Sequence, residues 1–128
     1  MSGPARAGAL IYAKDMNRLA VFYEALLGMR TLHATPELMV IESPDFQMVL
    51  HALPPAYAER VQLHTPPVPR EDTALKLFFT VDSLAEARER AAEFGGIVFD
   101  EEWAGPRFRV RNACDPEGNV FQLREFFA

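Results

Sequence analysis

The side chains of this chain that could do chemistry gather at alternate positions of its strand-like segments. Successive side chains of a strand point to opposite faces of a sheet, so an apolar set marks the face that a helix covers. The opposite face is then polar and cationic. Its expected members are Tyr12, His51, Lys76, Thr80, Arg107, Arg109, Gln122 and Arg124. Arginine and lysine bind carboxylate, phosphate or enolate oxygens, and a histidine can act as a general base.

Aromatic side chains on or near this face could line a cup for a small molecule. The candidates are Tyr12, Phe78, Trp103 and Phe108. Trp103 and Phe108 could equally belong to the core. In 107–111, Phe108 and Val110 form the apolar set, which places Arg107 and Arg109 on the face away from the helix.

Each chemically able residue also has a structural alternative. The arginines of 107–111 could lie on a solvated strand face or pair with acids at a subunit contact. Lys76 could extend its ammonium group to water. His51 could be a hydrogen-bonded structural histidine. The single cysteine, Cys114, has no histidine close in sequence and is predicted to be structural.

The elements that would position these residues occur twice. A helix is expected at 16–27, with Asp15 as its N-cap and Gly28 at its C-terminal end. Adding 67 to these numbers gives Asp82 and Gly95 around a second helical stripe with the same spacing. The expected strands are 9–13, 29–34, 37–42, 46–53, 75–81, 97–103, 106–112 and 119–126.

The order β-α-β-β-β therefore repeats, which predicts an α+β fold with helices on one face of each sheet. Prolines concentrate between the repeats, where a linker with a short helix at 56–62 is expected. We predict one domain, 1–128, made of repeats at about 8–54 and 73–127 with a linker at about 54–73.

Composition narrows the class of protein. The chain has 128 residues, of which 49% are hydrophobic and 24% charged, as in an ordinary folded domain. Its net charge of −5 argues against nucleic acid or an anionic membrane as partner. One cysteine excludes an internal disulfide framework. Neither a membrane-spanning run nor a signal peptide is recognised, so a cytoplasmic location is expected.

Two stretches resemble the vicinal oxygen chelate superfamily, the group of glyoxalase I, bleomycin-resistance proteins and extradiol dioxygenases. Residues 15–29 are similar to its first helix, and the Asp-Pro-Glu-Gly-Asn turn at 115–119 with the apolar strand after it is similar to its final hairpin. The resemblance implies paired βαβββ modules that form a curled, cup-shaped mixed sheet with helices on the outer face. It also implies a homodimer and a divalent metal held by His and Glu ligands.

The metal-ligand positions that the resemblance implies fall at Gly8, His51, Lys76 and Gln122. A slip of one residue would move the first to Ala9 and the third to Leu75. Glycine offers no ligand atom, and a protonated lysine repels a cation. The sequence therefore predicts that the usual metal site is absent, and no cofactor is expected.

Two classes of function remain open. The first is a protein that binds a small anionic or aromatic molecule in the sheet concavity. The second is an enzyme, a lyase or dioxygenase type, with a relocated metal or metal-free acid–base chemistry. There His51 would be the general base and Lys76 an electrophilic stabiliser. His33 or Glu42 could complete a relocated site.

Overall fold

The computed structural model describes residues 4–127 and contains two compact units that divide between Gln62 and Leu63. The division falls inside the proline-rich segment predicted as a linker. Each unit contains one four-stranded sheet with an α-helix of at least ten residues. The sheets are open, so each has two edge strands.

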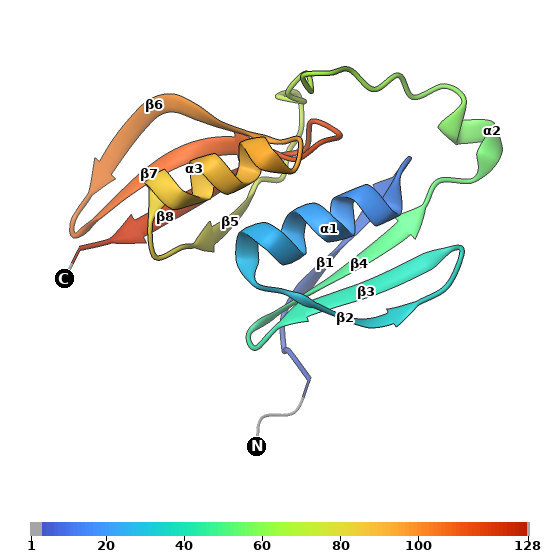
Figure 1. The fold of residues 1–128 in the computed structure, drawn as a ribbon, viewed down its shortest axis with the longest axis horizontal. Helices are drawn as coiled ribbons and strands as arrows, with labels where there is room; N and C mark the ends of the chain where they lie inside the picture. Colours follow the sequence, from blue (N-terminus) through green and yellow to red (C-terminus); the bar gives the residue numbers. More distant parts are fainter. Residues whose placement is uncertain (1–3, 128) are drawn as a thin grey trace. The chain divides into compact units, whose positions relative to one another are not determined.

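The first unit has the predicted order of one helix between a first strand and three more (Figure 1). Its elements are β1 (Gly8–Ala13), α1 (Met16–Leu27), β2 (Arg30–Ala34), β3 (Leu38–Ser43), β4 (Phe46–Ala52) and the short α2 (Pro55–Ala58). The strand order is β1-β4-β3-β2, and β1 runs parallel to β4 while the other pairs are antiparallel. The short helix ends at Ala58, before the predicted limit of 62.

Helix α1 confirms the local signals in the sequence. The Asp15 side chain accepts a hydrogen bond from the Arg18 backbone N–H at 3.1 Å, which satisfies a donor of the first turn. Gly28 ends the helix with a φ of +67°, a conformation that glycine adopts at little cost. The helix buries Leu19, Phe22 and other apolar side chains on one side of the sheet.

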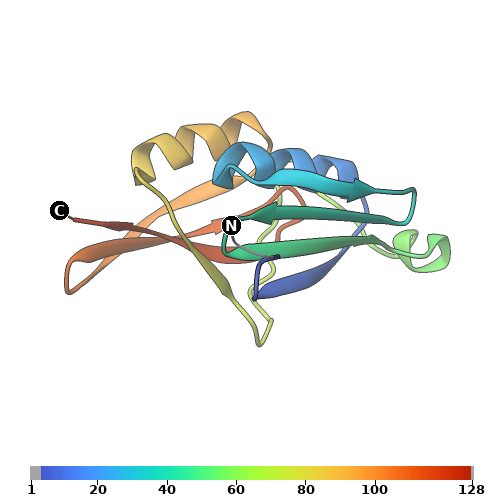
Figure 2. The same ribbon diagram turned by 90° about the horizontal axis from the view of Figure 1, so that it is seen from below.

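The second unit repeats this topology. Its elements are β5 (Leu77–Thr80), α3 (Leu84–Glu93), β6 (Ile97–Gly105), β7 (Phe108–Cys114) and β8 (Val120–Phe126). The strand order is β5-β8-β7-β6, with β5 parallel to β8 and the remaining pairs antiparallel. In each unit the helix lies on one side of its own sheet (Figure 2). The α+β class and the doubled βαβββ order are therefore confirmed, whereas closure of the sheets into one cup stays a prediction.

The predicted cap of the second helix is wrong by one residue. Ser83, not Asp82, adopts the extended N-cap conformation, and its hydroxyl oxygen accepts from the Glu86 backbone N–H at 3.1 Å. Both residue types are good caps, so backbone geometry decides between them. Strand β5 is also shorter than predicted, and Lys76 lies just outside it.

The proline-rich segment of the second unit is tied to the turn before β8. The Arg70 backbone N–H donates to the Gly118 carbonyl oxygen at 2.8 Å, and Arg70 forms a parallel bridge with Asn119. Gly118 has a φ of +84°, and a Cβ there would collide with the Val68 carbonyl oxygen. The turn itself is held by the buried Asp115, whose carboxylate accepts from the backbone N–H groups of residues 117 and 119.

No helix among residues 4–127 is long and apolar enough to cross a lipid bilayer.

Candidate functional site

The face of the second sheet that α3 does not cover is rich in aromatic side chains. Residues paired directly across strands share a face, and the pairings define two rows there. One row is Thr80, Arg124, Val110 and Trp103, and the next is Phe126, Phe108 and Gly105. Phe78 and Gln122 pair on the same face. We call this surface the uncovered face of the second sheet.

Arg124 lies at the centre of this face, among three phenylalanine rings. Its guanidinium carbon is 4.3 Å from the ring centroid of Phe78, 5.0 Å from that of Phe126 and 6.0 Å from that of Phe108. Its Nε donates to the Thr80 hydroxyl oxygen at 3.1 Å. We call these five residues the Arg124 cluster.

The Arg124 cluster lacks a carboxylate. Within residues 4–127, Arg124 forms no ion pair, and its hydrogen bond to Thr80 uses only Nε. Cation–π contacts hold a guanidinium in place without neutralising its charge. The aromatic neighbours also remain accessible, since Phe78 is 56% and Phe126 50% exposed. The cluster therefore offers a fixed positive charge beside apolar surface that a ligand could cover.

The arginines of β7 lie on the opposite face, which corrects the prediction for Arg109. Arg109 pairs with Glu125 and Arg111 with Leu123, a fully buried residue of the helix-covered side. Phe108 and Val110 consequently lie on the uncovered face. The alternation Arg-Phe-Arg-Val-Arg does not by itself say which set faces the helix, and here glutamates on neighbouring strands neutralise the charged set.

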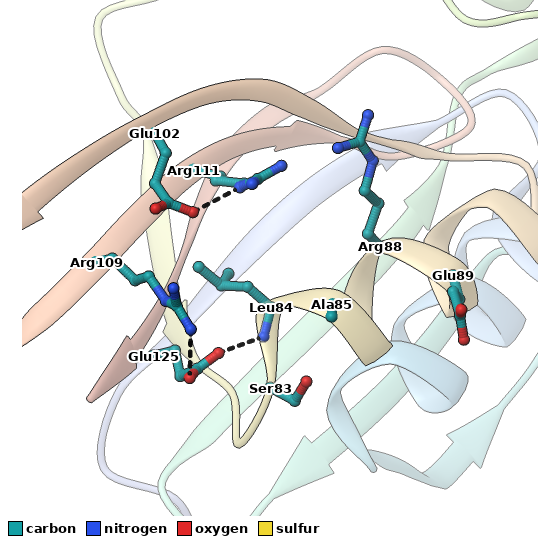
Figure 3. Close-up of a pocket in the computed structure, with 9 residues that line it drawn as sticks. All are labelled: Ser83, Leu84, Ala85, Arg88, Glu89, Glu102, Arg109, Arg111 and Glu125. Carbon is teal, nitrogen blue, oxygen red and sulfur yellow. Dashed lines mark hydrogen bonds and ion pairs between the residues drawn. The ribbon is translucent and has the colours of Figure 1, made fainter. Parts of the chain in front are cut away.

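Those ion pairs border a pocket of about 390 Å³ between α3 and the sheet. Figure 3 shows Arg109 facing Glu125 and Arg111 facing Glu102. The two ion pairs have N–O distances of 3.2 and 3.0 Å, respectively. A third arginine at the pocket, Arg88, pairs with Asp100 on β6. The arginines of this pocket thus have carboxylate partners, unlike Arg124.

Glu125 also fixes the start of α3. Its carboxylate accepts from the Leu84 backbone N–H at 2.7 Å and from Arg109. The hydrogen bond from Leu84, and to a smaller degree Arg109, holds the pKa of Glu125 below its ordinary value. This carboxylate is a structural anchor between β8 and the helix.

Two further predicted cations lie outside the strands. Arg107 is exposed in the turn between β6 and β7, where its φ is +105°. It is therefore not on the strand face predicted for it, because β7 begins only at Phe108. Lys76 is exposed immediately before β5. Among the described residues, neither side chain forms a hydrogen bond or ion pair with the Arg124 cluster, although Arg107 directly precedes Phe108 in the chain.

The uncovered face of the first sheet contains Tyr12 and His51, as predicted. These residues pair across β1 and β4, with ring centroids 5.5 Å apart. His51 Nδ1 lies 2.9 Å from the Ala52 carbonyl oxygen. A carbonyl oxygen only accepts, so this contact favours the tautomer with the proton on Nδ1 and a lone pair on Nε2. His51 is thus prepared to accept a proton or a hydrogen bond.

The predicted relocated site finds little support on this face. His33 pairs with Val40, and Glu42 pairs with Gln47, whose side-chain amide donates to the Glu42 carboxylate at 3.0 Å. Among residues 4–127 no group of three or more His, Cys, Asp or Glu side chains is arranged to hold a metal ion.

The residues at the family's metal-ligand positions do not fit a divalent ion. Gly8 pairs with Gln47, and a Cβ at residue 8 would collide with the Gln47 carbonyl oxygen. No ligand side chain can enter there without moving one of the two strands. Lys76 is cationic, and Gln122 offers only a neutral amide, which leaves His51 as the single strong donor.

Cys114 has the properties expected of a structural residue. It is fully buried at the end of β7. Burial and the neighbouring Asp115 raise the pKa of its thiol to about 11, so little thiolate forms near neutral pH.

Phe126 is the member of the cluster that the sequence analysis missed. It follows Gln122 and Arg124 at period two, so the alternation that places Arg124 on the uncovered face also places Phe126 there. The alternation of β8 is therefore sufficient to predict the face of Phe126, but the residue is easily overlooked because it is the last one of the strand. For Phe108 the sequence leaves open a cup-lining and a core position, because the alternation in 107–111 predicts the wrong face for this strand.

Comparisons of the sequence and of the structure with known proteins both identify glyoxalase-like relatives. The profile of a family described as "Glyoxalase-like domain" matches residues 9–124. A search of curated proteins found no match to this sequence. Among solved structures, the chain is similar to a glyoxalase/bleomycin resistance protein/dioxygenase family enzyme from Burkholderia phytofirmans. The identity is 17%, the TM-score is 0.72, and 94% of this chain and 97% of that chain are covered.

It is also similar to the fosfomycin resistance protein FosX from Listeria monocytogenes, with 15% identity and a TM-score of 0.66. That match covers 98% of this chain and 93% of the other. FosX from Mesorhizobium loti matches with 12% identity and a TM-score of 0.63, over 98% of this chain and 92% of that one. At these identities the structural matches establish the fold.

Proposed function

Since the chain belongs to the glyoxalase-like domain family, we propose that it binds a small anionic molecule on the uncovered face of its second sheet. The single observation that carries this proposal is Arg124, a cation held among half-exposed phenylalanine rings and without a carboxylate partner in the described part of the chain, residues 4–127. An arginine fixed in this way loses little conformational freedom when it binds an anion. The ligand would supply the missing negative charge.

The arginines on the helix-covered face of the same sheet differ from Arg124 in having carboxylate partners. There Arg109 and Arg111 have glutamate partners at 3.2 and 3.0 Å. An anionic ligand in that pocket would have to compete with those carboxylates. At Arg124 no carboxylate among residues 4–127 would compete with it.

The test is a ligand-observed NMR screen of small anions, each paired with a neutral analogue of the same shape. We expect anions to bind the wild-type protein and to lose at least about tenfold in affinity with Arg124→Gln, which corresponds to about 1.4 kcal/mol. Arg107→Gln removes the same charge from an exposed turn of the same unit and is the matched control. Equal anion binding by the two variants would overturn the proposal.

An enzymatic function is the second candidate, and His51 is the observation that favours it. The contact between Nδ1 and the Ala52 carbonyl oxygen leaves Nε2 as a base on the uncovered face of the first sheet. Of the three structural relatives named above, one is a glyoxalase/bleomycin resistance protein/dioxygenase family enzyme and two are fosfomycin resistance proteins.

This candidate is tested by screening dicarbonyl, thiol-adduct and catechol substrates against wild type, His51→Gln and Lys76→Met. Turnover that falls at least about 100-fold with His51→Gln, a size typical of a lost general base, would establish the enzyme. Elemental analysis of protein purified without a metal-binding tag tests the alternative of a relocated metal. Metal-free protein without turnover would leave binding as the function.

A further inference from the structure

We infer that the ligand of the Arg124 cluster is a flat aromatic monocarboxylate. This inference rests on the proposed function and narrows it to one chemical class. Three features of the uncovered face carry it: the part of the guanidinium that remains available, the number of charges on the face, and the kind of surface that surrounds Arg124.

The available part of the Arg124 guanidinium has the geometry of a carboxylate receptor. Nε is occupied by the Thr80 hydroxyl at 3.1 Å, and the central carbon lies 4.3 Å from the Phe78 ring centroid. The hydrogen bond leaves Nη1 and Nη2, which point along the far edge of the planar group. Two parallel N–H donors match the two oxygens of a carboxylate.

The charge of the face indicates a single negative charge on the ligand. Arg124 is the one cationic side chain at the paired positions of β5, β7 and β8 on this face, within the described residues. The nearest arginines in the pairing pattern, Arg109 and Arg111, lie on the opposite face with glutamates. A phosphate dianion favours several cations, whereas one guanidinium balances one carboxylate.

The surface beside Arg124 indicates an aromatic body. Phe78, Phe126 and Trp103 are 56%, 50% and 42% exposed, and Phe108 contacts Phe126 with ring centroids 5.3 Å apart. Exposed aromatic side chains gathered at one site mark a surface that binds apolar groups. Aromatic rings gain additional energy from stacked or edge-to-face contacts with another ring. A ligand ring attached to the carboxylate would cover these side chains.

The inference is tested by titrating the protein with sodium benzoate, cyclohexanecarboxylate, benzamide and inorganic phosphate, using calorimetry. Trp103 is the only tryptophan and lies on the same face, so its fluorescence gives a second readout. We expect benzoate to bind at least about fivefold more tightly than cyclohexanecarboxylate and about tenfold more tightly than benzamide, the latter equal to about 1.4 kcal/mol. Phosphate should bind more weakly than benzoate.

Variants assign the effect to the cluster. Phe78→Leu should reduce the preference for benzoate over cyclohexanecarboxylate to about twofold or less, while Tyr57→Leu, which removes a similarly exposed ring in the first unit, should leave it unchanged. Arg124→Lys keeps the charge but loses the paired donors, and we expect it to weaken benzoate binding by about tenfold. Circular dichroism and thermal melting check that each variant is folded.

The outcomes separate the two proposals. Equal binding of benzoate and cyclohexanecarboxylate, or tighter binding of phosphate, would overturn the aromatic monocarboxylate while an effect of Arg124→Lys or Arg124→Gln would sustain the anion site. If no anion binds in a manner that depends on Arg124, both proposals fail. The expected order of affinities, together with the effect of Phe78→Leu, would support both.

Discussion

The uncovered faces of the two sheets differ in chemistry although the sheets share one topology. The first carries Tyr12 and His51 among aliphatic side chains, and the second carries Arg124 among aromatic rings. Both helix-covered faces contain fully buried apolar residues, and that of the second sheet also carries the ion-paired Arg109 and Arg111. Packing against a helix therefore constrains one face of each repeat, and the other face is left free to acquire a binding function.

The largest effects are expected where the repeats are alike. Leu50 on β4 and Leu123 on β8 are both fully buried on the second strand of their sheets, counted from the edge formed by the unit's first strand. Replacement of either leucine by alanine leaves a cavity and should lower the free energy of unfolding by about 2–5 kcal/mol. Urea denaturation of the two variants measures this. A cost below about 1 kcal/mol in one of them would show that the two cores are not equivalent.

The next largest effect is expected at Gly8, the family metal-ligand position of the first repeat that has no side chain. Gly8→His places a Cβ against the Gln47 carbonyl oxygen and should destabilise the protein by about 1–3 kcal/mol, as overpacking does. It should also fail to raise zinc affinity above that of Leu10→His, which adds a histidine at an exposed position of the same strand. Tight zinc binding by Gly8→His, measured by calorimetry, would contradict the account of the metal-ligand positions.

A smaller effect distinguishes two carboxylates that hold backbone N–H groups. Glu125 accepts from Leu84 and from Arg109, whereas Glu42 accepts from the backbone N–H of Ala5 and from the Gln47 amide. Because Arg109 is partly exposed, we expect Glu125→Gln to cost only about 1 kcal/mol. Glu42→Gln breaks no ion pair with any of residues 4–127 and should cost about half as much in urea denaturation.

The same Glu125 comparison has a pH signature. The folded-state pKa of Glu125 lies below its ordinary value of 4.5, so the stabilisation is present above pH 4.5 and is lost as the pH falls through the lowered pKa. The stability difference between wild type and Glu125→Gln should therefore shrink in acid. If urea titrations show that the stability difference between wild type and Glu125→Gln stays constant down to pH 2.5, the ionised Glu125 carboxylate does not stabilise the folded state.

The smallest effects are expected on the uncovered faces. Arg124→Gln should change the free energy of unfolding by less than about 1 kcal/mol, because its cation–π contacts are partly exposed. His51→Gln, which loses a local contact with Ala52, should change it by less than about 0.5 kcal/mol. Thermal melting measures both. A larger loss in the free energy of unfolding for Arg124→Gln would mean that the Arg124 cluster stabilises the fold and would argue against a role in ligand binding.

Local signals explain which parts of the fold were predictable from the sequence. Helix α1 was predicted at its observed bounds because Asp15, the apolar stripe and Gly28 all act within the same stretch. The face of β7 was not, because the choice between arginines and apolar residues depends on Glu102 and Glu125, which come from other strands. Cross-strand pairing is set by register, which alternation alone does not specify.

The candidate site was predictable to the same extent. Arg124, Phe78 and Gln122 were placed on the correct face because the strands that carry them alternate clearly. The contact of Arg124 with rings on three strands depends on tertiary packing.

The hydrogen bond from the Arg70 backbone N–H to the Gly118 carbonyl oxygen determines where an isolated fragment of the second repeat should begin. By composition alone, an expression fragment of that repeat would begin near Thr73, after the last proline of the segment. Such a truncation would remove Arg70 and uncover the turn that Val68 contacts. A fragment that begins at Leu63 keeps Val68 and Arg70 in contact with the turn before β8. The prolines between Leu63 and Arg70 are then part of the folded second unit and not of a flexible linker.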